Sequence, residues 1–127
     1  MISDYLIFAF KHRSEELICE SWSNSESMPF LVLSTTMPRI IFLQEEIAIK
    51  SYEIKRGKRC TALKFHPHIS FLVLGWEDGS ITLWTEEDRS LNKSREFGKD
   101  EISCIEFNIT GNRMASGDNV LYLYKLR

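Results

Sequence analysis

The residues best suited to metal chemistry in this sequence are two histidines, His66 and His68, which are one residue apart. Imidazole nitrogens are common zinc ligands, and residues i and i+2 of a strand point to the same face. Pro67 stands between them, however, and no Cys, Asp or Glu accompanies them at a ligand spacing. Because proline restricts the residue before it and donates no backbone hydrogen bond, we expect a surface turn at residues 66–68. We therefore predict no metal site, and expect His66 to cap the end of a strand.

General acid-base chemistry often uses carboxylates, and three of them are adjacent in the sequence: Glu86, Glu87 and Asp88. Such chemistry also needs a partner group and a desolvated cleft that shifts a pKa, whereas these residues lie in a charged run typical of a solvated loop. The sequence contains neither a G-x-S-x-G nucleophile elbow nor a glycine-rich phosphate loop. We predict no catalytic residue and no cofactor site, and expect that the protein is not an enzyme.

Three cysteines, Cys19, Cys60 and Cys104, are present and none belongs to a CxxC pair. Cys19 and Cys104 each lie three residues before an aromatic residue, Trp22 and Phe107 respectively. Small apolar thiols of this kind are typical of inward-facing core positions in a reducing compartment. The alternative is one disulfide with a leftover thiol.

The overall composition favours a folded domain and excludes two classes of partner. At 127 residues and 43% hydrophobic content, the chain has the length and composition of a single globular domain. Sixteen Lys and Arg against eighteen Asp and Glu leave a formal charge of −2 without a basic stripe, so we expect no nucleic-acid partner. The apolar residues 5–10 precede the basic residues 11–13, which is the wrong order for a secretory signal, and no stretch approaches 18 apolar residues. We expect a cytoplasmic protein without direct membrane insertion.

The chain repeats itself with a period of about 42 residues, which matches the spacing of propeller blades. Trp22 lies 43 residues before Phe65, and Phe107 lies 42 residues after it, each at the end of a short apolar run. The string at residues 30–34, FLVLS, recurs as FLVLG at residues 71–75. About four short strands per unit of this length are typical of WD-type β-propellers.

The second unit shows the strand pattern most clearly. Asp78 and Gly79 are expected to form a two-residue hairpin turn, because Gly supplies the positive φ that such a turn requires. Gly75 is expected to relieve crowding where neighbouring blades meet. The strands predicted from alternation and turn signals are residues 60–65, 71–76, 81–84 and 93–97.

The predicted fold is therefore all-β, with about three blades of a WD40-type β-propeller. We place the first blade at about residues 14–55, the second at 57–97 and the third at 98–127, with 4–10 as a possible closure strand. The outer strand of the first blade is expected at residues 47–54, although a helix over 45–55 is the alternative. Because a ring needs at least about four blades, we expect an incomplete propeller that is an N-terminal fragment of a larger protein.

Two tryptophans in the second unit have different predicted roles. Trp84 stands where WD repeats place their tryptophan, and we expect it in the core. Trp76 comes just before the turn, where it would be partly exposed beside Glu77 and Asp78. An exposed aromatic next to acidic groups is a common anchor for a protein partner. Trp76, Glu77 and Asp78 are thus the candidate partner-binding residues.

The second unit resembles WD-repeat proteins through an apolar strand, His66-Pro67, a second apolar strand, Asp78-Gly79 and the sequence ITLW at residues 81–84. Gly57-Lys58 stands where many WD repeats have Gly-His. More narrowly, the string LVLGWEDG at residues 72–79, with the third-unit segment 112–118, is similar to the N-terminal propeller of the intraflagellar transport protein 140 family. Members of that family are large WD-repeat subunits of the ciliary intraflagellar transport A complex.

This resemblance implies a non-catalytic scaffold that acts in retrograde ciliary transport and cilium assembly through protein-protein interactions. The implied partners are other intraflagellar transport A complex subunits and ciliary membrane-protein cargo or its adaptors. The implied location is the cilium and its base. The alternative is another WD-repeat adaptor, in a vesicle coat, a ubiquitin ligase or a chromatin scaffold.

Overall fold

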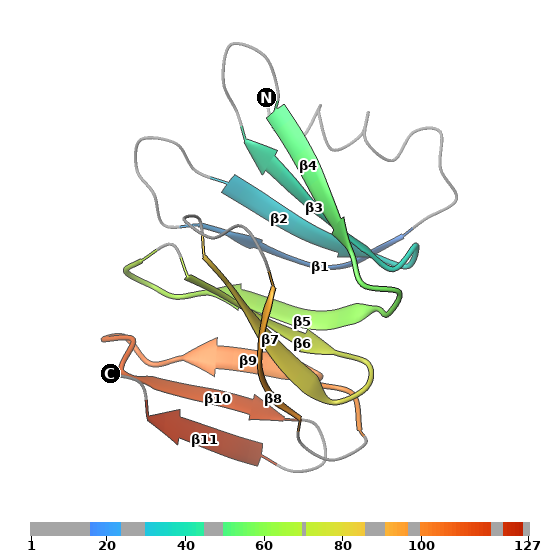
Figure 1. The fold of residues 1–127 in the computed structure, drawn as a ribbon. Coiled ribbons are helices and arrows are strands. Elements are labelled where there is room, and N and C mark those ends of the chain that lie inside the picture. Colours follow the sequence, from blue (N-terminus) through green and yellow to red (C-terminus); the bar gives the residue numbers. More distant parts are fainter. Residues whose placement is uncertain are drawn as a thin grey trace.

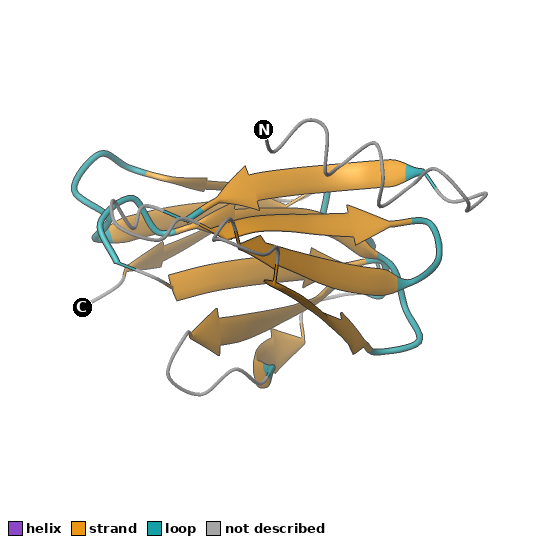
Figure 2. Cartoon of the chain, turned by 90° about the horizontal axis from the view of Figure 1, so that it is seen from above, coloured by secondary structure: helices purple, strands orange, loops and turns teal. Residues whose placement is uncertain are grey.

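The structure of the chain is a computed structural model. It describes residues 16–23, 30–44, 50–69, 71–85, 91–96, 100–117 and 121–125. These residues form eleven β-strands and no helix (Figures 1 and 2). The strands make three antiparallel sheets, and the prediction of an all-β chain of propeller blades is confirmed. In Figure 1 the sheets follow one another in chain order from the top of the view to the bottom.

Each sheet is built from strands that are consecutive in the sequence. The first sheet holds β1 (Leu17–Trp22), β2 (Phe30–Thr35), β3 (Arg39–Gln44) and β4 (Lys50–Lys55) in that order. The second sheet holds β5 (Cys60–Phe65), β6 (Phe71–Trp76), β7 (Ser80–Thr85) and β8 (Asn92–Glu96). The third sheet holds β9 (Cys104–Phe107), β10 (Arg113–Gly117) and β11 (Leu121–Lys125) among the described residues.

The first two strands of every sheet pair in the same register, which is the structural counterpart of the sequence repeat. The aromatic residue that ends each inner strand is paired with the second residue of the following strand. The pairs are Trp22 with Leu31, Phe65 with Leu72 and Phe107 with Met114.

The first and second sheets also share a β-bulge in the inner strand. It lies between Leu17 and Cys19 in the first sheet and between Cys60 and Ala62 in the second, which are equivalent positions. The prediction that Trp22, Phe65 and Phe107 end equivalent inner strands is confirmed. These inner strands are neighbours in space, since β1 contacts β5 and β5 contacts β9.

The second sheet is buried on both faces, which explains why β6 is almost entirely apolar. Side chains alternate along a strand, so Leu72 and Leu74 face the first sheet while Val73 faces the third. A sheet with one solvated face would need a polar residue at every second position. The unbroken apolar run in β6 is therefore a consequence of its place between two other sheets.

Trp84 is the centre of the junction between the first and second sheets. Its side chain is fully buried. Its ring centroid lies 4.7 Å from that of Phe42 and 6.3 Å from that of Phe65. The Phe65 ring meets it edge-on, at an interplanar angle of 83°. Both arrangements are favourable for aromatic pairs. The prediction that Trp84 is a core residue is confirmed.

The second and third sheets approach so closely at Gly75 that no side chain fits there. A Cβ atom on Gly75 would lie 2.4 Å from Cγ2 of Ile102. Backbone and hydroxyl groups join the two sheets at this place: the Ile102 N–H donates to the Trp76 carbonyl at 3.2 Å, and the Thr61 hydroxyl donates to the Ile102 carbonyl. The prediction that Gly75 relieves crowding between blades is confirmed.

His66 and His68 join the second sheet to the third just after the end of β5, whereas the Thr61 contact lies near its beginning. His66 Nε2 lies 2.9 Å from the Gly111 carbonyl oxygen and His68 Nε2 lies 2.7 Å from that of Ile109. The His68 N–H donates to His66 Nδ1 at 3.0 Å, so Nδ1 accepts and Nε2 is the nitrogen that donates to Gly111. Residues 66–68 form the expected turn, and its imidazoles bind backbone carbonyls of the neighbouring sheet.

One of the three cysteines departs from its predicted environment. Cys60 is buried and Cys19 is half-buried, but Cys104 is exposed, so the expectation that it faces the core is wrong. Cys104 is equivalent to Cys19, whose side chain packs against the next sheet, and no sheet covers that face of β9 among the described residues. All three thiols are free.

Several expectations concern the outer strands and the loops. The strand expected at 47–54 is found as β4, and the one expected at 93–97 as β8, each displaced by one to three residues. The closure strand predicted at 4–10 and the carboxylates at 86–88 lie outside the described residues. The three sheets fall within the three predicted blades, whose boundaries stay a prediction.

Replacing Gly75 by Ala should lower the free energy of unfolding by about 1–3 kcal/mol, because the new methyl group overlaps Ile102. Chemical denaturation of the wild-type and variant chains measures this loss. The second substitution Ile102→Gly removes both overlapping atoms, Cγ2 and Cβ, so the double variant should lose less than the sum of the two single losses. An unchanged midpoint for Gly75→Ala would mean that the two sheets do not pack as described.

Candidate partner-binding site

The turn between β6 and β7 contains three residues, 77–79, rather than the predicted two. Gly79 has a φ of 83°, and its N–H donates to the Trp76 carbonyl at 3.0 Å. A hairpin loop of three residues whose last residue is left-handed is a common connection, and Gly fits that position best. The prediction of a tight turn with Gly79 at positive φ is confirmed, and only its length was wrong.

Trp76 is buried, so the expectation that it is partly exposed is wrong. Only 1% of the residue is accessible, and its indole N–H donates to Thr82 Oγ1 at 2.8 Å. The guanidinium carbon of Arg56 lies 4.6 Å from the ring centroid, a cation–π arrangement. The connection between β4 and β5 thus covers a ring that the sequence pattern places at the exposed end of a strand.

Asp78 is the electrostatic centre of the turn. Its carboxylate lies 2.7 Å from Lys58 Nζ and 3.7 Å from Arg56 Nη2, and it accepts the Ser80 N–H at 3.0 Å. Partial burial raises the pKa of Asp78, but the hydrogen bonds from Lys58 and Ser80 and the nearby Arg56 charge outweigh it and hold the pKa well below its usual value. Asp78 is therefore a fixed anion in this site.

Glu77 connects the same turn to the backbone of the β4–β5 connection. Its carboxylate accepts the Arg59 N–H, and its own N–H donates to the Arg59 carbonyl at 3.0 Å. Glu77 is exposed, and so are Lys58 and Arg59. The turn and the connection together form a charged surface, which we call the turn surface and define by Arg56, Lys58, Arg59, Glu77 and Asp78.

The turn surface brings together two of the three predicted site residues, Glu77 and Asp78, and basic residues that were not predicted as part of the site. Arg56 and Arg59 carry no sequence signal of their own. Lys58 could have been found, because Gly57-Lys58 replaces the Gly-His of many WD repeats and lies 20 residues before the turn aspartate. Each acidic group of the turn surface has a donor partner, and the exposed charges of Lys58, Arg59 and Glu77 suit recognition of a complementary protein surface.

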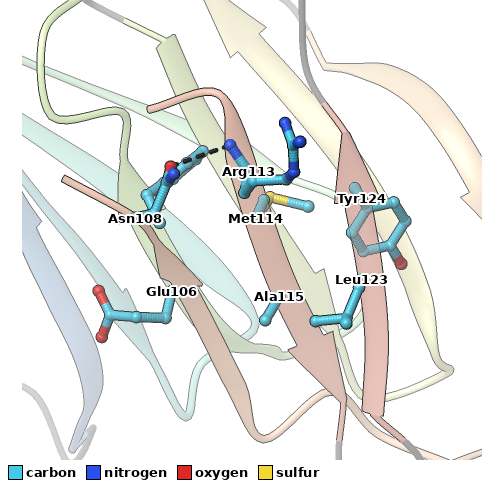
Figure 3. Close-up of a pocket in the computed structure, with 8 residues that line it drawn as sticks. Glu106, Asn108, Arg113, Met114, Ala115, Leu123 and Tyr124 are labelled. Carbon is cyan, nitrogen blue, oxygen red and sulfur yellow. Dashed lines mark hydrogen bonds between the residues drawn. The ribbon is translucent and has the colours of Figure 1, made fainter. Parts of the chain in front are cut away.

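A second candidate surface is a groove of about 310 Å³ on the third sheet (Figure 3). Glu106, Ala115 and Leu123 form one row across the three strands there, since Ala115 pairs with both of the others. Leu123 is 76% exposed, although the equivalent residue of the first sheet, Phe42, is 1% exposed. The groove therefore lies on the face that the other two sheets use to pack against the next sheet.

Two kinds of feature are not found in the part of the chain that the structure describes. No group of three or more His, Cys, Asp and Glu residues there is arranged to hold a metal ion. The same residues include no helix with the length and hydropathy needed to cross a membrane.

Comparisons with known proteins agree with the fold. The family described as IFT140 first β-propeller matches residues 21–126 of the chain. The chain is also similar to Polycomb protein esc of Drosophila virilis and of Drosophila melanogaster, each 33% identical over 94 residues. Each of these matches covers 69% of this chain and 22% of the relative, so the chain spans only a small part of the length of these curated relatives.

Replacing Asp78 by Asn should lower the free energy of unfolding at pH 7 by roughly 1 kcal/mol, because charge-assisted hydrogen bonds are lost. The folded-state pKa of Asp78 is lowered, so the stability contributed by its carboxylate is complete above the ordinary value of 3.8 and declines as the pH falls below it. Denaturation of both chains between pH 7 and pH 2 should show the difference shrinking. The exposed Asp100 provides the control variant Asp100→Asn. If the stability difference between wild type and Asp78→Asn did not change with pH, the Asp78 carboxylate would not be held by these contacts.

Replacing Gly79 by Val should destabilise the chain by about 1 kcal/mol or more, since a β-branched residue fits a left-handed conformation poorly. Gly79→Asn is the matched control, because Asn tolerates this conformation and should cost less than Val. The measurement is the midpoint of chemical denaturation. Equal midpoints for the Val and Asn variants would show that backbone conformation at residue 79 does not limit stability.

Proposed function

Because the chain belongs to the family of IFT140 first β-propellers, we propose that it is part of a non-catalytic scaffold of the intraflagellar transport A complex. In this proposal it acts in retrograde ciliary transport and cilium assembly, at the cilium and its base. The observation that carries the proposal is the family match over residues 21–126, which includes all of the described second and third sheets and most of the first.

The partners in this proposal are other subunits of the complex and ciliary membrane-protein cargo or its adaptors. The turn surface is the contact site that we propose for one of them. Glu77 is exposed at the turn, and 48% of the Lys58 side chain is accessible, so a partner can contact both side chains while they keep their bonds to Arg59 and Asp78. Trp76 takes part only indirectly, because its buried ring packs against the guanidinium group of Arg56.

A second candidate function is a chromatin scaffold. It is favoured by the similarity to Polycomb protein esc, which is 33% identical over 94 residues. Both candidates use the same kind of all-β platform, so the fold alone does not separate them. They differ in cellular location and in the proteins that are bound.

A single experiment distinguishes the two candidates. An epitope tag introduced at the gene's own locus in a ciliated cell should place the protein at ciliary bases and shafts and co-purify large WD-repeat transport subunits. The variant Glu77→Lys tests the turn surface in the same cells, with the exposed Glu101→Lys as the matched control for the charge change. Co-purification should weaken for the first variant only. A protein found only in the nucleus would overturn the transport proposal in favour of the chromatin scaffold.

A further inference from the structure

Cys19 and Cys60 face each other across the junction of the first and second sheets. Cys19 lies on β1 and packs against the buried cluster that contains Cys60 of β5. The equivalent positions at the next junction are Ala62 and Ile102, and these two residues also belong to one cluster. The repeat thus makes these two positions contact partners, and only the first junction has a thiol at both.

Polar contacts hold the Cys19 sulfur beside Cys60. Cys19 Sγ lies 3.0 Å from Ser34 Oγ and 3.8 Å from the carbonyl oxygen of Cys60. The Ser34 hydroxyl donates to that same carbonyl at 2.8 Å. Cys60 Sγ donates to the Ala62 carbonyl oxygen at 3.3 Å. The Cys19 side chain therefore lies against Cys60 at a polar place in the junction.

The two thiols differ in acidity in a way that suits stepwise oxidation. The neighbouring Cys60 thiol, with a smaller contribution from Ser34, lowers the pKa of Cys19 despite its partial burial. Burial raises the pKa of Cys60 well above its usual value. Cys19 is half-buried and Cys60 is buried, so a small oxidant reaches Cys19 more easily. The thiolate is the form that reacts with peroxide.

We propose that Cys19 and Cys60 are a redox-sensitive pair that forms a reversible disulfide when a hydroperoxide oxidises Cys19. In the first step the Cys19 thiol attacks hydrogen peroxide, the O–O bond breaks, and Cys19 sulfenic acid and one water form. In the second step the Cys60 sulfur attacks the Cys19 sulfur, the S–O bond breaks, and the Cys60 proton leaves with the hydroxyl group as a second water. The two thiols are oxidised by two electrons in all, and the peroxide is reduced.

Such a disulfide would join the inner strands of two adjacent sheets by a covalent bond. Its two sulfurs come from residues 41 positions apart, so the bond would close a loop that contains nearly all of the first sheet. Oxidation would thereby fix the first sheet on the second, and a thiol reductant would release it. Cytosolic disulfides of this kind are usually transient and redox-sensing.

The test is oxidation of the reduced native chain with hydrogen peroxide, followed by alkylation and peptide mass mapping. The expected result is a Cys19–Cys60 disulfide, a mass lower by two hydrogens, alkylation of Cys104 alone, and reversal by dithiothreitol. The Cys104→Ser variant should behave in the same way. Cys19→Ala and Cys60→Val should each abolish the disulfide. Ala is the residue at the position equivalent to Cys19, which is Ala62, and Val is similar to the residue equivalent to Cys60, which is Ile102.

Two further measurements do not depend on the folding of a variant. Oxidation in guanidinium should lose the selectivity for this pair, because the fold no longer brings the two thiols together. Alkylation of the tagged protein in lysates of peroxide-treated cells requires no purified chain and should show the same pair. A disulfide that involves Cys104, or Cys19 oxidised to sulfinic acid while Cys60 stays free to alkylate, would overturn the proposal.

Discussion

Burial of both faces of the second sheet is the constraint on which the rest of the structure depends. Leu72 and Leu74 of β6 face the first sheet and Val73 faces the third, so this sheet cannot meet its hydrophobic requirement alone. Units that bury their faces only against neighbours are typical of repeat folds. The junctions between sheets, more than the sheets themselves, therefore determine whether this chain is stable.

The junctions also explain where the polar and small residues lie. Inner strands that approach one another closely leave no room for a side chain at Gly75, and they need hydrogen bonds for the backbone groups they bury. The first junction uses the Ser34 hydroxyl for the carbonyl of Cys60, and the second uses the Thr61 hydroxyl for that of Ile102. A platform fastened in this way keeps its surface turns in fixed positions, which a scaffold requires.

The repeat made much of the fold predictable, because hydrophobic period and turn chemistry are local properties. The equivalence of Trp22 and Phe65 follows from the 43-residue spacing between two units, and the turn at Gly79 and the place of Trp84 follow from the pattern of one unit. The environment of Trp76 was not predictable in this way, since its exposure depends on Arg56, a residue of the connection between sheets. Lys58 and Asp78 are paired by packing across 20 residues, and the sequence signal for this pair is that Lys58 stands where many WD repeats have His. The exposure of Cys104 depends on what covers the third sheet, and its sequence position resembles that of Cys19.

Residue-resolved hydrogen-deuterium exchange tests the dependence of the sheets on their junctions most directly. The N–H of Ile102 donates across the second junction to Trp76, and the N–H of Phe65 donates across the first junction to Ser21. If the junctions hold the sheets together, these two amides should exchange as slowly as the ladder amide of Val73 in the middle of β6. Rapid exchange at Ile102 and Phe65 while Val73 stays protected would show that the sheets open independently, and would contradict this prediction.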